Sequence, residues 1–415
     1  MASEWKECTL AELGEIVGGA TPSTKDESNY GGDIAWITPK ELSTLKGRFI
    51  AHGERNITEK GLNSCSTQLM PANAVLFSSR APIGYVAIAK NPVCTNQGFK
   101  SIVANEDNDP MFLYYLLKYN KEAIEAMGSG TTFKEVSGST MRGIRVRVPV
   151  SKVEQQRIAS VLAALDSKIE NNNKINDNLL RQAQLHFHSW FVDYQPFGGK
   201  RPDDWTEGVF ADIVDFSNGY AFKSKELLDA PHPDCYRVFK QGHIFRGGGF
   251  NPNGTKSWYP RCKADGLKRY VLKKGDILMA MTDMKDNVQI LGNTAIMEVD
   301  DQYIVNQRVG VLRCKKERGI SYPYVFLLTN GKDFLLDLRS RANSGVQVNL
   351  SSTEIKNSPI YIAPRHVYDE FTSIVLPMFE TMISNDIQNQ QLAELRDTLL
   401  PKLMSGEIDV SDIQL

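Results

Sequence analysis

The stretch EQQRIASVLAALDSKIENNNKIN, residues 154–176, has the spacing of an amphipathic helix and then sets amides where apolar side chains should continue. Its apolar positions recur at intervals of four, three and four residues, at Ile158, Leu162, Leu165 and Ile169. The same spacing leads next to Asn172 and Asn176. Intervals of three and four place side chains on one face of a helix. The pattern therefore predicts one long helix over about 151–192, with two amides in its apolar seam.

A second long helix is predicted from about His366 to about Met404. Its seam is mostly apolar and also passes through two amides and an arginine: Val375, Met378, Met382, Asn385, Asn389, Leu392, Arg396, Leu399 and Leu403. Pro377 has no backbone N–H and should kink or end the helix, so that regular helix begins only after it. Two helices of one chain that each carry a single apolar seam are expected to pair along it.

The two helices close two similar halves of the chain. Four blocks recur in order at offsets that grow from 200 to 215 residues: 5–19 with 205–219, AVLFSSR (74–80) with DILMAMT (276–282), TNQGFKSIV (95–103) with VNQRVGVL (305–312), and SGTTF (129–133) with SGVQV (344–348). Slowly growing offsets are what loop insertions in a duplicated unit produce. Each half is filled by short β-rich runs bounded by Gly, Pro and Asn, with short helical patterns between them.

These patterns predict an α+β fold class with alternating segments. Two duplicated, β-rich segments of mixed α/β type are expected at 1–150 and 196–364, and two long-helix segments at 151–195 and 365–415. A chain of 415 residues is long enough for two or three domains.

Composition and charge indicate a folded protein with unlike faces. The apolar fraction of 41% and charged fraction of 23% are those of a soluble globular chain. Residues 237–274 carry ten Lys or Arg and one acid, whereas the chain from 366 onward carries nine Asp or Glu against two cations. Six scattered cysteines argue against a disulfide framework or zinc site. With no run of 18 apolar residues to span a membrane, we expect a cytoplasmic protein.

The motifs that resemble catalytic or cofactor sites all fail in their spacing. In GFNPNGTKS (249–257), Thr255 intrudes between the glycine and lysine of a phosphate-binding loop. RGGGF (246–250) lacks the spacing of a dinucleotide site. His186 and His188 point to different sides of a helix and cannot share a metal. The sequence therefore predicts a binding protein with no catalytic residue, metal site or cofactor of its own.

Several stretches together resemble the specificity subunit of type I restriction–modification systems. They occur in the expected order over essentially the whole chain: WKECTLAELGEIVGGATPS (5–23), YGGDIAWITPKEL (30–42), LFSSRAPIGYVAIA (76–89), TNQGFK (95–100), EQQRIASVLAALDSKIE (154–170) and LRDTLLPKLMSGEI (395–408). No one motif is sharp, but the ordered set in duplicate is specific.

The resemblance implies that residues 1–150 and 196–364 are two target-recognition domains, each reading one half of a split target in double-stranded DNA. The two long helices would pair antiparallel as a coiled-coil spacer. Two modification subunits, which bind S-adenosylmethionine, would carry out methylation, and separate motor–nuclease restriction subunits would cleave the DNA.

An antiparallel pair places the middle of one helix against the middle of the other. Asn172 and Asn176 should then lie opposite Asn385 and Asn389. Polar seam positions lower stability but disfavour slipped registers, which would leave amides unpaired in an apolar layer.

Phosphate contacts require cations on loops, and base contacts require polar side chains in a groove. On that ground, the expected DNA contacts are Thr38, Lys40, Arg80, Lys100, Lys134, Lys240, Gln241, Arg246, Lys256, Thr282, Lys285 and Gln347. Arg80 aligns with Thr282, so the two halves do not share that cation. The pairs Asn96–Gln97 and Asn306–Gln307 recur in both halves. They are expected to hold a turn through bonds to the backbone rather than to read the DNA sequence.

Two other readings of the sequence stay open. The chain could be a stand-alone methyltransferase or nuclease, although no methyl-donor loop or metal-binding acid cluster is visible. It could also be a scaffold that binds protein or RNA, because the basic segment 237–274 carries aromatic residues suited to stacking on bases, among them Phe239, Phe245, Phe250, Trp258 and Tyr259.

Overall fold

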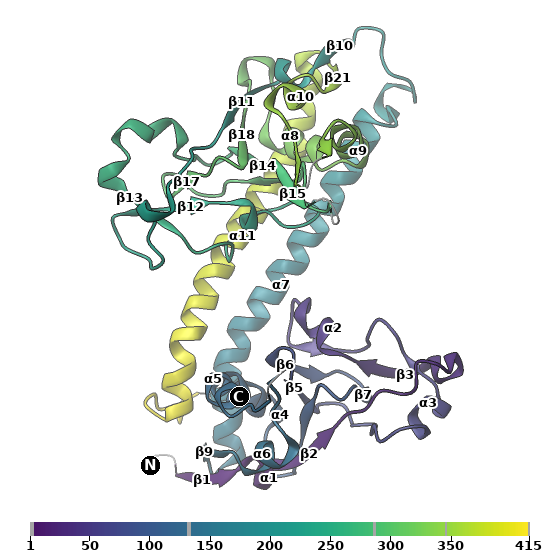
Figure 1. Cartoon of the computed structure of the whole chain (residues 1–415), viewed down its shortest axis with the longest axis vertical. Coiled ribbons are helices and arrows are strands. Elements are labelled where there is room, and N and C mark those ends of the chain that lie inside the picture. Colours follow the sequence, from purple (N-terminus) through teal and green to yellow (C-terminus); the bar gives the residue numbers. More distant parts are fainter. Residues whose placement is uncertain (1–3, 131–133, 285–287, 345–346, 414–415) are drawn as a thin grey trace. The chain divides into compact units, whose positions relative to one another are not determined.

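A computed structural model describes residues 4–130, 134–284, 288–344 and 347–413. The chain forms two compact units: unit 1 contains Met1–Lys174 and Gln388–Leu415, and unit 2 contains Ile175–Ile387 (Figure 1). Each unit therefore takes half of each long helix. The four consecutive segments predicted above follow the chain instead, and their bounds stay a prediction. Among the described helices, none combines the length and apolar character needed to cross a membrane.

Unit 1 is built on a five-stranded sheet in the order β2-β8-β5-β6-β4. Its strands are β2 (Gly14–Gly18), β4 (Phe49–Ile50), β5 (Val75–Ser79), β6 (Ile83–Ala89) and β8 (Lys100–Ala104). Two further pairs are β1 (Trp5–Thr9) with β9 (Arg145–Pro149), and β3 (Tyr30–Ile37) with β7 (Val93–Thr95). The helices are α1 (Leu10–Leu13), α2 (Pro39–Ser43), α3 (Glu59–Asn63), α4 (Pro110–Tyr119), α5 (Lys121–Ala126) and α6 (Gly138–Gly143).

Helix α4 covers the sheet of unit 1. It begins where the Asp109 side chain accepts a hydrogen bond from the Phe112 N–H and Pro110 occupies the first turn. The helix packs against β5, β6 and β8, with Phe112 and Tyr115 among its buried residues. Every residue of β5 is buried, as expected for a central strand covered on both faces.

Unit 2 repeats this plan with a four-stranded sheet in the order β11-β18-β14-β16. Its strands are β11 (Val214–Asn218), β14 (Ile277–Ala280), β16 (Thr294–Ile296) and β18 (Val309–Cys314). Around it lie β10 (Thr206–Val209), β12 (Cys235–Phe239), β13 (Trp258–Pro260), β15 (Thr282–Met284), β17 (Tyr303–Val305), β19 (Asn343–Ser344), β20 (Gln347–Asn349) and β21 (Pro359–Ile362). The helices are α8 (Tyr322–Thr329), α9 (Lys332–Ser340) and α10 (Ser352–Lys356).

The predicted duplication is confirmed strand by strand. The order β2-β8-β5-β6 corresponds to β11-β18-β14-β16. The parallel pair β3–β7 ends with Ile37 opposite Thr95, and its counterpart β12–β17 ends with Phe239 opposite Val305. The fold class is thus α+β, as predicted from the repeat.

A pair of glycines shows how closely the two copies agree. A Cβ on Gly19 would lie 2.2 Å from the Asn96 carbonyl oxygen, and a Cβ on Gly219 would lie 2.2 Å from that of Asn306. No side chain fits at such distances, because they are well inside van der Waals contact. Each copy therefore needs glycine directly after β2 or β11, where the chain passes the loop that leads into β8 or β18.

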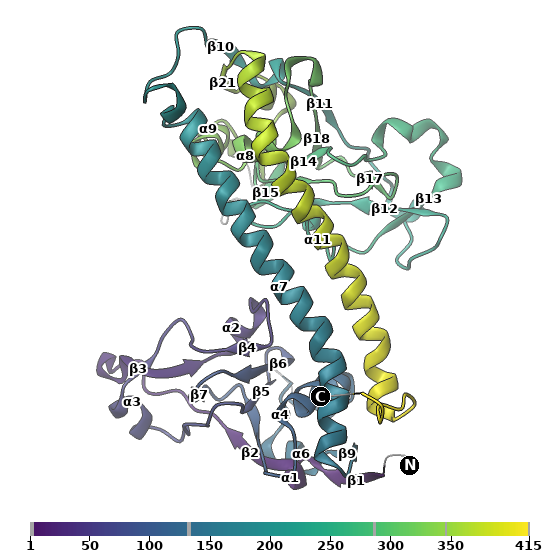
Figure 2. The ribbon, with the colours of Figure 1, turned by 180° about the vertical axis from the view of Figure 1, so that it is seen from behind.

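The two long helices are α7 (Lys152–Phe191) and α11 (Arg365–Ser405). In each unit they lie side by side and run in opposite directions, as both ribbon views show (Figures 1 and 2). In unit 1, Asp166 of α7 meets Arg396 of α11, and in unit 2, Phe191 of α7 stacks on Tyr368. The predicted seam residues on both helices are all buried or half-buried.

The prediction that regular helix begins only after Pro377 is wrong, because α11 continues through it. Pro377 lies on the exposed side of the helix, while Phe371, Val375 and Phe379 are buried in the core of unit 2. Burial of these side chains, at about 1.5–3 kcal/mol each, offsets the backbone hydrogen bond that proline cannot make.

Candidate nucleic-acid interface

In unit 1, a pocket of about 510 Å³ lies between three loop segments. One wall is the β3–α2 junction, with Thr38 and Lys40; another is the turn after β5, with Arg80. The third is the loop between β7 and β8, which includes Asn96 and Gly98. Three residues predicted from separate stretches of sequence are thus brought to one place.

The predicted residues of unit 1 mostly have partners within the protein. Thr38 caps α2 through bonds with the Glu41 carboxylate, so its hydroxyl has a structural role. The Lys40 ammonium lies 2.5 Å from Glu54, and both side chains are well exposed. Arg80 and Lys100 share Glu135, at 3.6 and 3.4 Å. The pairs of Lys40 and Arg80 are exposed and weak, which leaves these two cations able to exchange a carboxylate for a phosphate, whereas the Lys100 side chain is only 16% exposed. Lys134 is exposed beside them.

In unit 2, a second pocket of about 460 Å³ lies beside the segment that follows β14, where Thr282 begins β15. The Thr282 hydroxyl donates a hydrogen bond of 2.8 Å to Gln241 Oε1, so these two predicted residues meet. Lys240 is half-buried, whereas Arg246 and Lys256 are exposed on loops. Lys285 lies outside the described residues, as does the side chain of Gln347, whose backbone begins β20.

The two recurring asparagines hold turns, as predicted, but within the described residues the glutamines that follow them do not bond to the backbone in this way: Gln97 accepts from the Thr21 hydroxyl, and Gln307 is exposed. The Asn96 Oδ1 accepts a hydrogen bond of 2.9 Å from the Gly98 N–H. The Asn306 Oδ1 accepts one of 3.3 Å from the Arg308 N–H. In each copy the backbone N–H of the same asparagine also donates to the end of the neighbouring parallel strand, at Ile37 or Phe239.

The aromatic residues of the basic segment mostly pack within unit 2. The His243 ring is fully buried and stacks on Phe239, with the two ring centroids 5.1 Å apart, and on Phe250. Burial, reinforced by the nearby Arg237 guanidinium, lowers the pKa of His243 to about 4, so the ring is neutral at neutral pH. Phe245, 49% exposed, is the aromatic side chain of the predicted five that lies most open to solvent.

The seam amides contact one another within each unit. In unit 1, Asn172 donates through Nδ2 to Gln388 at 2.8 Å and to Asn389 at 3.0 Å. In unit 2, Asn176 accepts from Asn385 at 2.8 Å and donates to Asp386 at 2.9 Å. The four predicted amides are therefore opposed in two pairs, each reinforced by a polar neighbour that the spacing did not indicate.

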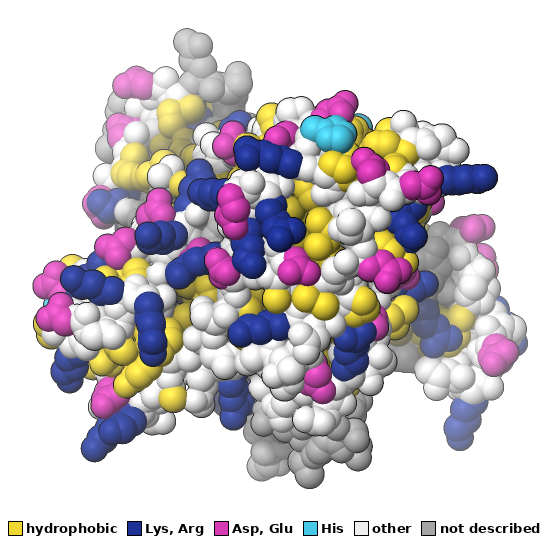
Figure 3. Space-filling model, turned by 90° about the horizontal axis from the view of Figure 1, so that it is seen from above, with side chains coloured by type: hydrophobic (Ala, Val, Ile, Leu, Met, Phe, Trp, Pro, Cys, Tyr) yellow, Lys and Arg dark blue, Asp and Glu magenta, His cyan; other side chains and the backbone are white. Residues whose placement is uncertain are grey.

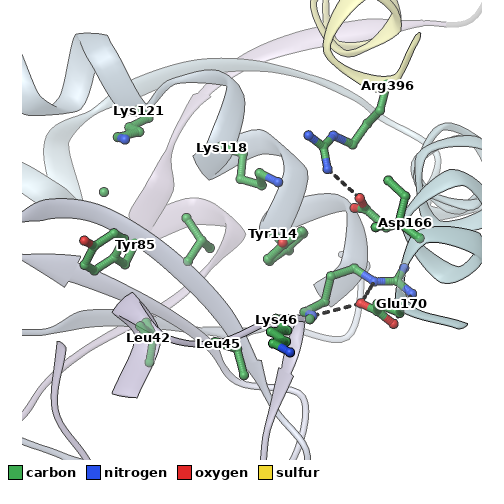
Figure 4. A pocket seen from close by; sticks show the side chains of 15 residues that line it. Leu42, Leu45, Lys46, Tyr85, Tyr114, Lys118, Lys121, Asp166, Glu170 and Arg396 are labelled. Atoms are coloured by element: carbon green, nitrogen blue, oxygen red, sulfur yellow. Dashed lines mark hydrogen bonds and ion pairs between the residues drawn. The ribbon is translucent and has the colours of Figure 1, made fainter. Parts of the chain in front are cut away.

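A second feature absent from the predictions is a charged junction in unit 1 (Figure 4). The buried Arg48 donates through Nε to Glu170 of α7 at 2.9 Å. Arg396 of α11 donates to Asp166 of α7 at 2.7 Å. The Tyr115 hydroxyl of α4 also donates to Asp166, at 2.6 Å. Partners in the chain are more than 50 residues apart, so no sequence pattern could have linked them.

On the face shown in Figure 3, charge alone does not single out a contact surface, because Lys and Arg side chains are interspersed with Asp and Glu. The pockets and their polar walls therefore carry more information than bulk charge.

Arg308, on the wall of the unit 2 pocket, is a cation that the sequence analysis missed. Its signal was present, because it takes the place of Gly98 in the aligned blocks 95–103 and 305–312.

Comparisons with known proteins agree over both halves of the chain. The family model for the type I restriction modification DNA specificity domain matches residues 2–181 and 202–395. The specificity subunit of the type I restriction enzyme MjaIX from Methanocaldococcus jannaschii is 32% identical over 429 residues, covering 99% of this chain and 95% of its own. The HindI specificity subunit from Haemophilus influenzae is 22% identical, covering 98% and 100%.

A solved structure shares the fold. The S subunit of a type I restriction–modification system from M. genitalium superposes with a TM-score of 0.61 at 18% identity, covering 97% of this chain and 96% of its own. The chain therefore belongs to the DNA specificity subunits of type I restriction–modification systems, which recognise a target in two parts, perform no catalysis themselves, and direct methylation and cleavage.

Proposed function

We propose that each unit reads one part of the DNA target with the side chains around a single turn. In unit 1 this is the turn after β5, with Arg80, and in unit 2 it is the corresponding junction of β14 and β15, with Thr282. The observation that supports this most is the duplication: the two halves repeat the same strands and the same asparagine-held loop, and each has a pocket beside the corresponding turn.

The side chains around these turns suit DNA contact. Lys40, Arg80 and Lys100 of unit 1 can bind phosphates, and so can the exposed Arg246 and Lys256 of unit 2. Phosphate contacts set affinity and orientation, whereas polar groups in the pockets can contact base edges. The remaining predicted residues, among them Thr38, Lys134, Lys240, Lys285 and Gln347, belong to the same proposal.

The chain has no methylation chemistry of its own in this proposal. Two modification subunits, each with its own S-adenosylmethionine, bind it and methylate the target, and restriction subunits join this complex to cleave DNA. Two copies of the modification subunit match the two copies of the recognition unit. A complex of this kind acts on DNA in the cytoplasm.

The test is to co-express this chain with its modification subunits and map methylated bases across the host genome. We expect a motif in two specified parts separated by a gap of fixed length and no sequence preference. A host that carries the modification subunits alone is the matched control and should show no such motif. A continuous motif would contradict the two-unit model.

Binding to RNA is the second candidate, because basic and aromatic residues occur together in 237–274. The structure disfavours it in one respect: Phe239 and Tyr259 are buried and cannot stack on a base without unfolding. Competition between duplex DNA and single-stranded RNA of the same sequence for the complete complex separates the two. We expect the duplex to displace RNA at far lower concentration.

A further inference from the structure

The two units open their pockets on opposite sides of the same pair of segments. That pair is the turn with Arg80 or Thr282, and the loop with Gly98 or Arg308. In unit 1 the pocket lies between this pair and the β3–α2 junction, at Pro39 and Lys40. In unit 2 it lies between the pair and the end of β11, at Asn218 and Ala221.

In unit 2, a glutamine closes the side of the two segments that holds the pocket in unit 1. Gln241 stands in the duplicated sequence where unit 1 has Pro39, two residues after the parallel strand. Proline has no side-chain donor or acceptor, whereas Gln241 both donates to the Thr282 carbonyl oxygen and accepts from its hydroxyl. The side chain of Gln241 thus joins the two walls that stand apart in unit 1.

In unit 1, polar contacts occupy the side of the two segments that holds the pocket in unit 2. There, the Thr21 hydroxyl donates to Gln97, and Glu135 lies against both Arg80 and Lys100. In unit 2 the position of Thr21 is held by Ala221, which has no hydroxyl to offer Gln307. Glu135 is replaced by Asn349, since Val136 and Leu350 bond equivalently to Ser79 and Met281. In unit 2 this side holds the pocket of about 460 Å³, with Ala221 and Asn349 in its wall.

Arg308 lies on this side of unit 2. Its side chain is exposed, and its guanidinium has no hydrogen-bond or ion-pair partner in the part of the chain that the structure describes. The same position in unit 1 is tighter, because a Cβ on Gly98 would lie 3.0 Å from both Pro39 Cγ and Asn96 Oδ1, and these side chains would have to shift by a few tenths of an ångström. The change from Pro39 to Gln241 removes one of these two neighbours at Arg308.

We infer that Arg308, with Gln307 and Asn218 beside it, forms the base-reading wall of unit 2, and that Arg308 contacts a guanine. This rests on the proposed function of the two units. A phosphate needs only donors, whereas this wall combines a forked guanidinium with the amide of Gln307 and with that of Asn218, which also contacts the Ser352 hydroxyl. Arginine pairs bidentately with guanine O6 and N7, and Asn and Gln pair with adenine, in the major groove. Unit 1 reads its part of the target from the other side of the turn.

The experiment uses the complete complex of this chain with its modification subunits and a set of duplexes in which each base pair of the target is replaced in turn. Arg308→Ala should weaken binding to the intact target about ten- to hundredfold. One substitution in one half of the target should then no longer matter, while discrimination in the other half is unchanged. Arg308→Lys keeps the charge but not the fork, and should show the same loss of discrimination. Arg318→Ala, which removes an exposed arginine elsewhere in unit 2, is the matched control.

The salt dependence separates the remaining outcomes. If Arg308→Ala weakens every duplex equally and lowers the slope of log affinity against log salt by about one, the residue contacts phosphate and the inference is overturned. Unchanged affinity, in a variant whose thermal unfolding matches the wild type, overturns it as well. If the wild-type complex itself shows no preference for any duplex, the proposed function fails rather than the role of Arg308.

Discussion

Among single residues, Glu298 is placed where a carboxylate is costly. It is 7% exposed, and its Oε2 has no hydrogen-bond partner in the described structure. Burial, with Asp386 of α11 adding a like charge, raises the pKa of Glu298 from 4.5 to about 8. The side chain is therefore largely protonated at neutral pH. Because folding raises its pKa, its contribution to stability is complete below about pH 4.5 and is lost as the pH rises through about 8.

Glu298→Gln should remove this dependence, since an amide stays neutral at every pH. We expect the variant to unfold at a higher temperature than the wild type at pH 7 to 8. At pH 7 its free energy of unfolding should be larger by on the order of 3 kcal/mol. The two proteins should be alike at pH 4.5. Thermal unfolding across this range, with the exposed Glu317→Gln as control, measures the difference. Equal melting temperatures for variant and wild type at pH 8 would show that Glu298 is ionised without cost.

For single residues, the sequence predicted which side chains hold turns better than it predicted the burial and the neighbours of a side chain. The turn-holding asparagines were predictable because they recur in both copies, and repetition in two different recognition surfaces indicates a structural role. Glu298 and Arg308 were not, because a carboxylate after a strand and an arginine after a glutamine look like ordinary surface. The raised pKa of Glu298 comes first from burial and then from Asp386, and the setting of Arg308 comes from Gln241 and Ala221, which stand where unit 1 has Pro39 and Thr21.

At the scale of elements, the polar layer between α7 and α11 was visible in the sequence as an interruption of helical spacing. The spacing predicted which residues face the partner helix, because helical periodicity is local. It did not indicate Gln388 or Asp386, which enter the layer through neighbouring turns. Nor did it predict that α11 would tolerate Pro377, because the compensating packing comes from unit 2 as a whole.

The pair Asn172 and Asn389 can be tested by double replacement with leucine. Asn172 is fully buried and its Oδ1 has no partner in the described structure, so apolar packing should raise the melting temperature of the chain. Asn172→Leu alone should lower it, because the amides of Gln388 and Asn389 then face an apolar group. A lower melting temperature for the double variant would contradict the idea that the buried pair of amides lowers the stability of the chain.

The same double variant should recognise its target less sharply. If the amides hold the helices in register, their loss should widen the range of gap lengths in the methylated motif. Methylation mapping in the host measures the gap directly. A gap as sharp as that of the wild type would mean that packing alone fixes the register.

For the molecule as a whole, the repeat in the sequence predicted two similar recognition units, and the structure confirms them. What could not be predicted is that each unit takes half of each long helix. The charged contacts of Arg48 and Arg396 with α7 join segments more than 100 residues apart, which no local pattern records.

Lengthening both helices tests whether they set the gap in the target. Seven residues inserted at matched positions of α7 and α11 preserve the seam and add about 10 Å of helix. We expect the mapped motif to keep both specified parts and to gain about three base pairs in its gap. Insertion into α7 alone breaks the register and serves as the control, with loss of methylation expected. An unchanged gap in the matched variant would show that the helices do not measure the target.

The division of the chain also dictates an order of events during synthesis. Unit 2 is continuous from Ile175 to Ile387, whereas the core of unit 1 includes Leu403, Met404 and Val410. A ribosome releases the N-terminal part of unit 1 first, yet that part cannot complete its core until the last residues emerge. The unit that is synthesised first is therefore completed last. A nascent chain interrupted near its end would carry a complete unit 2, and a unit 1 whose core lacks the side chains of Leu403, Met404 and Val410.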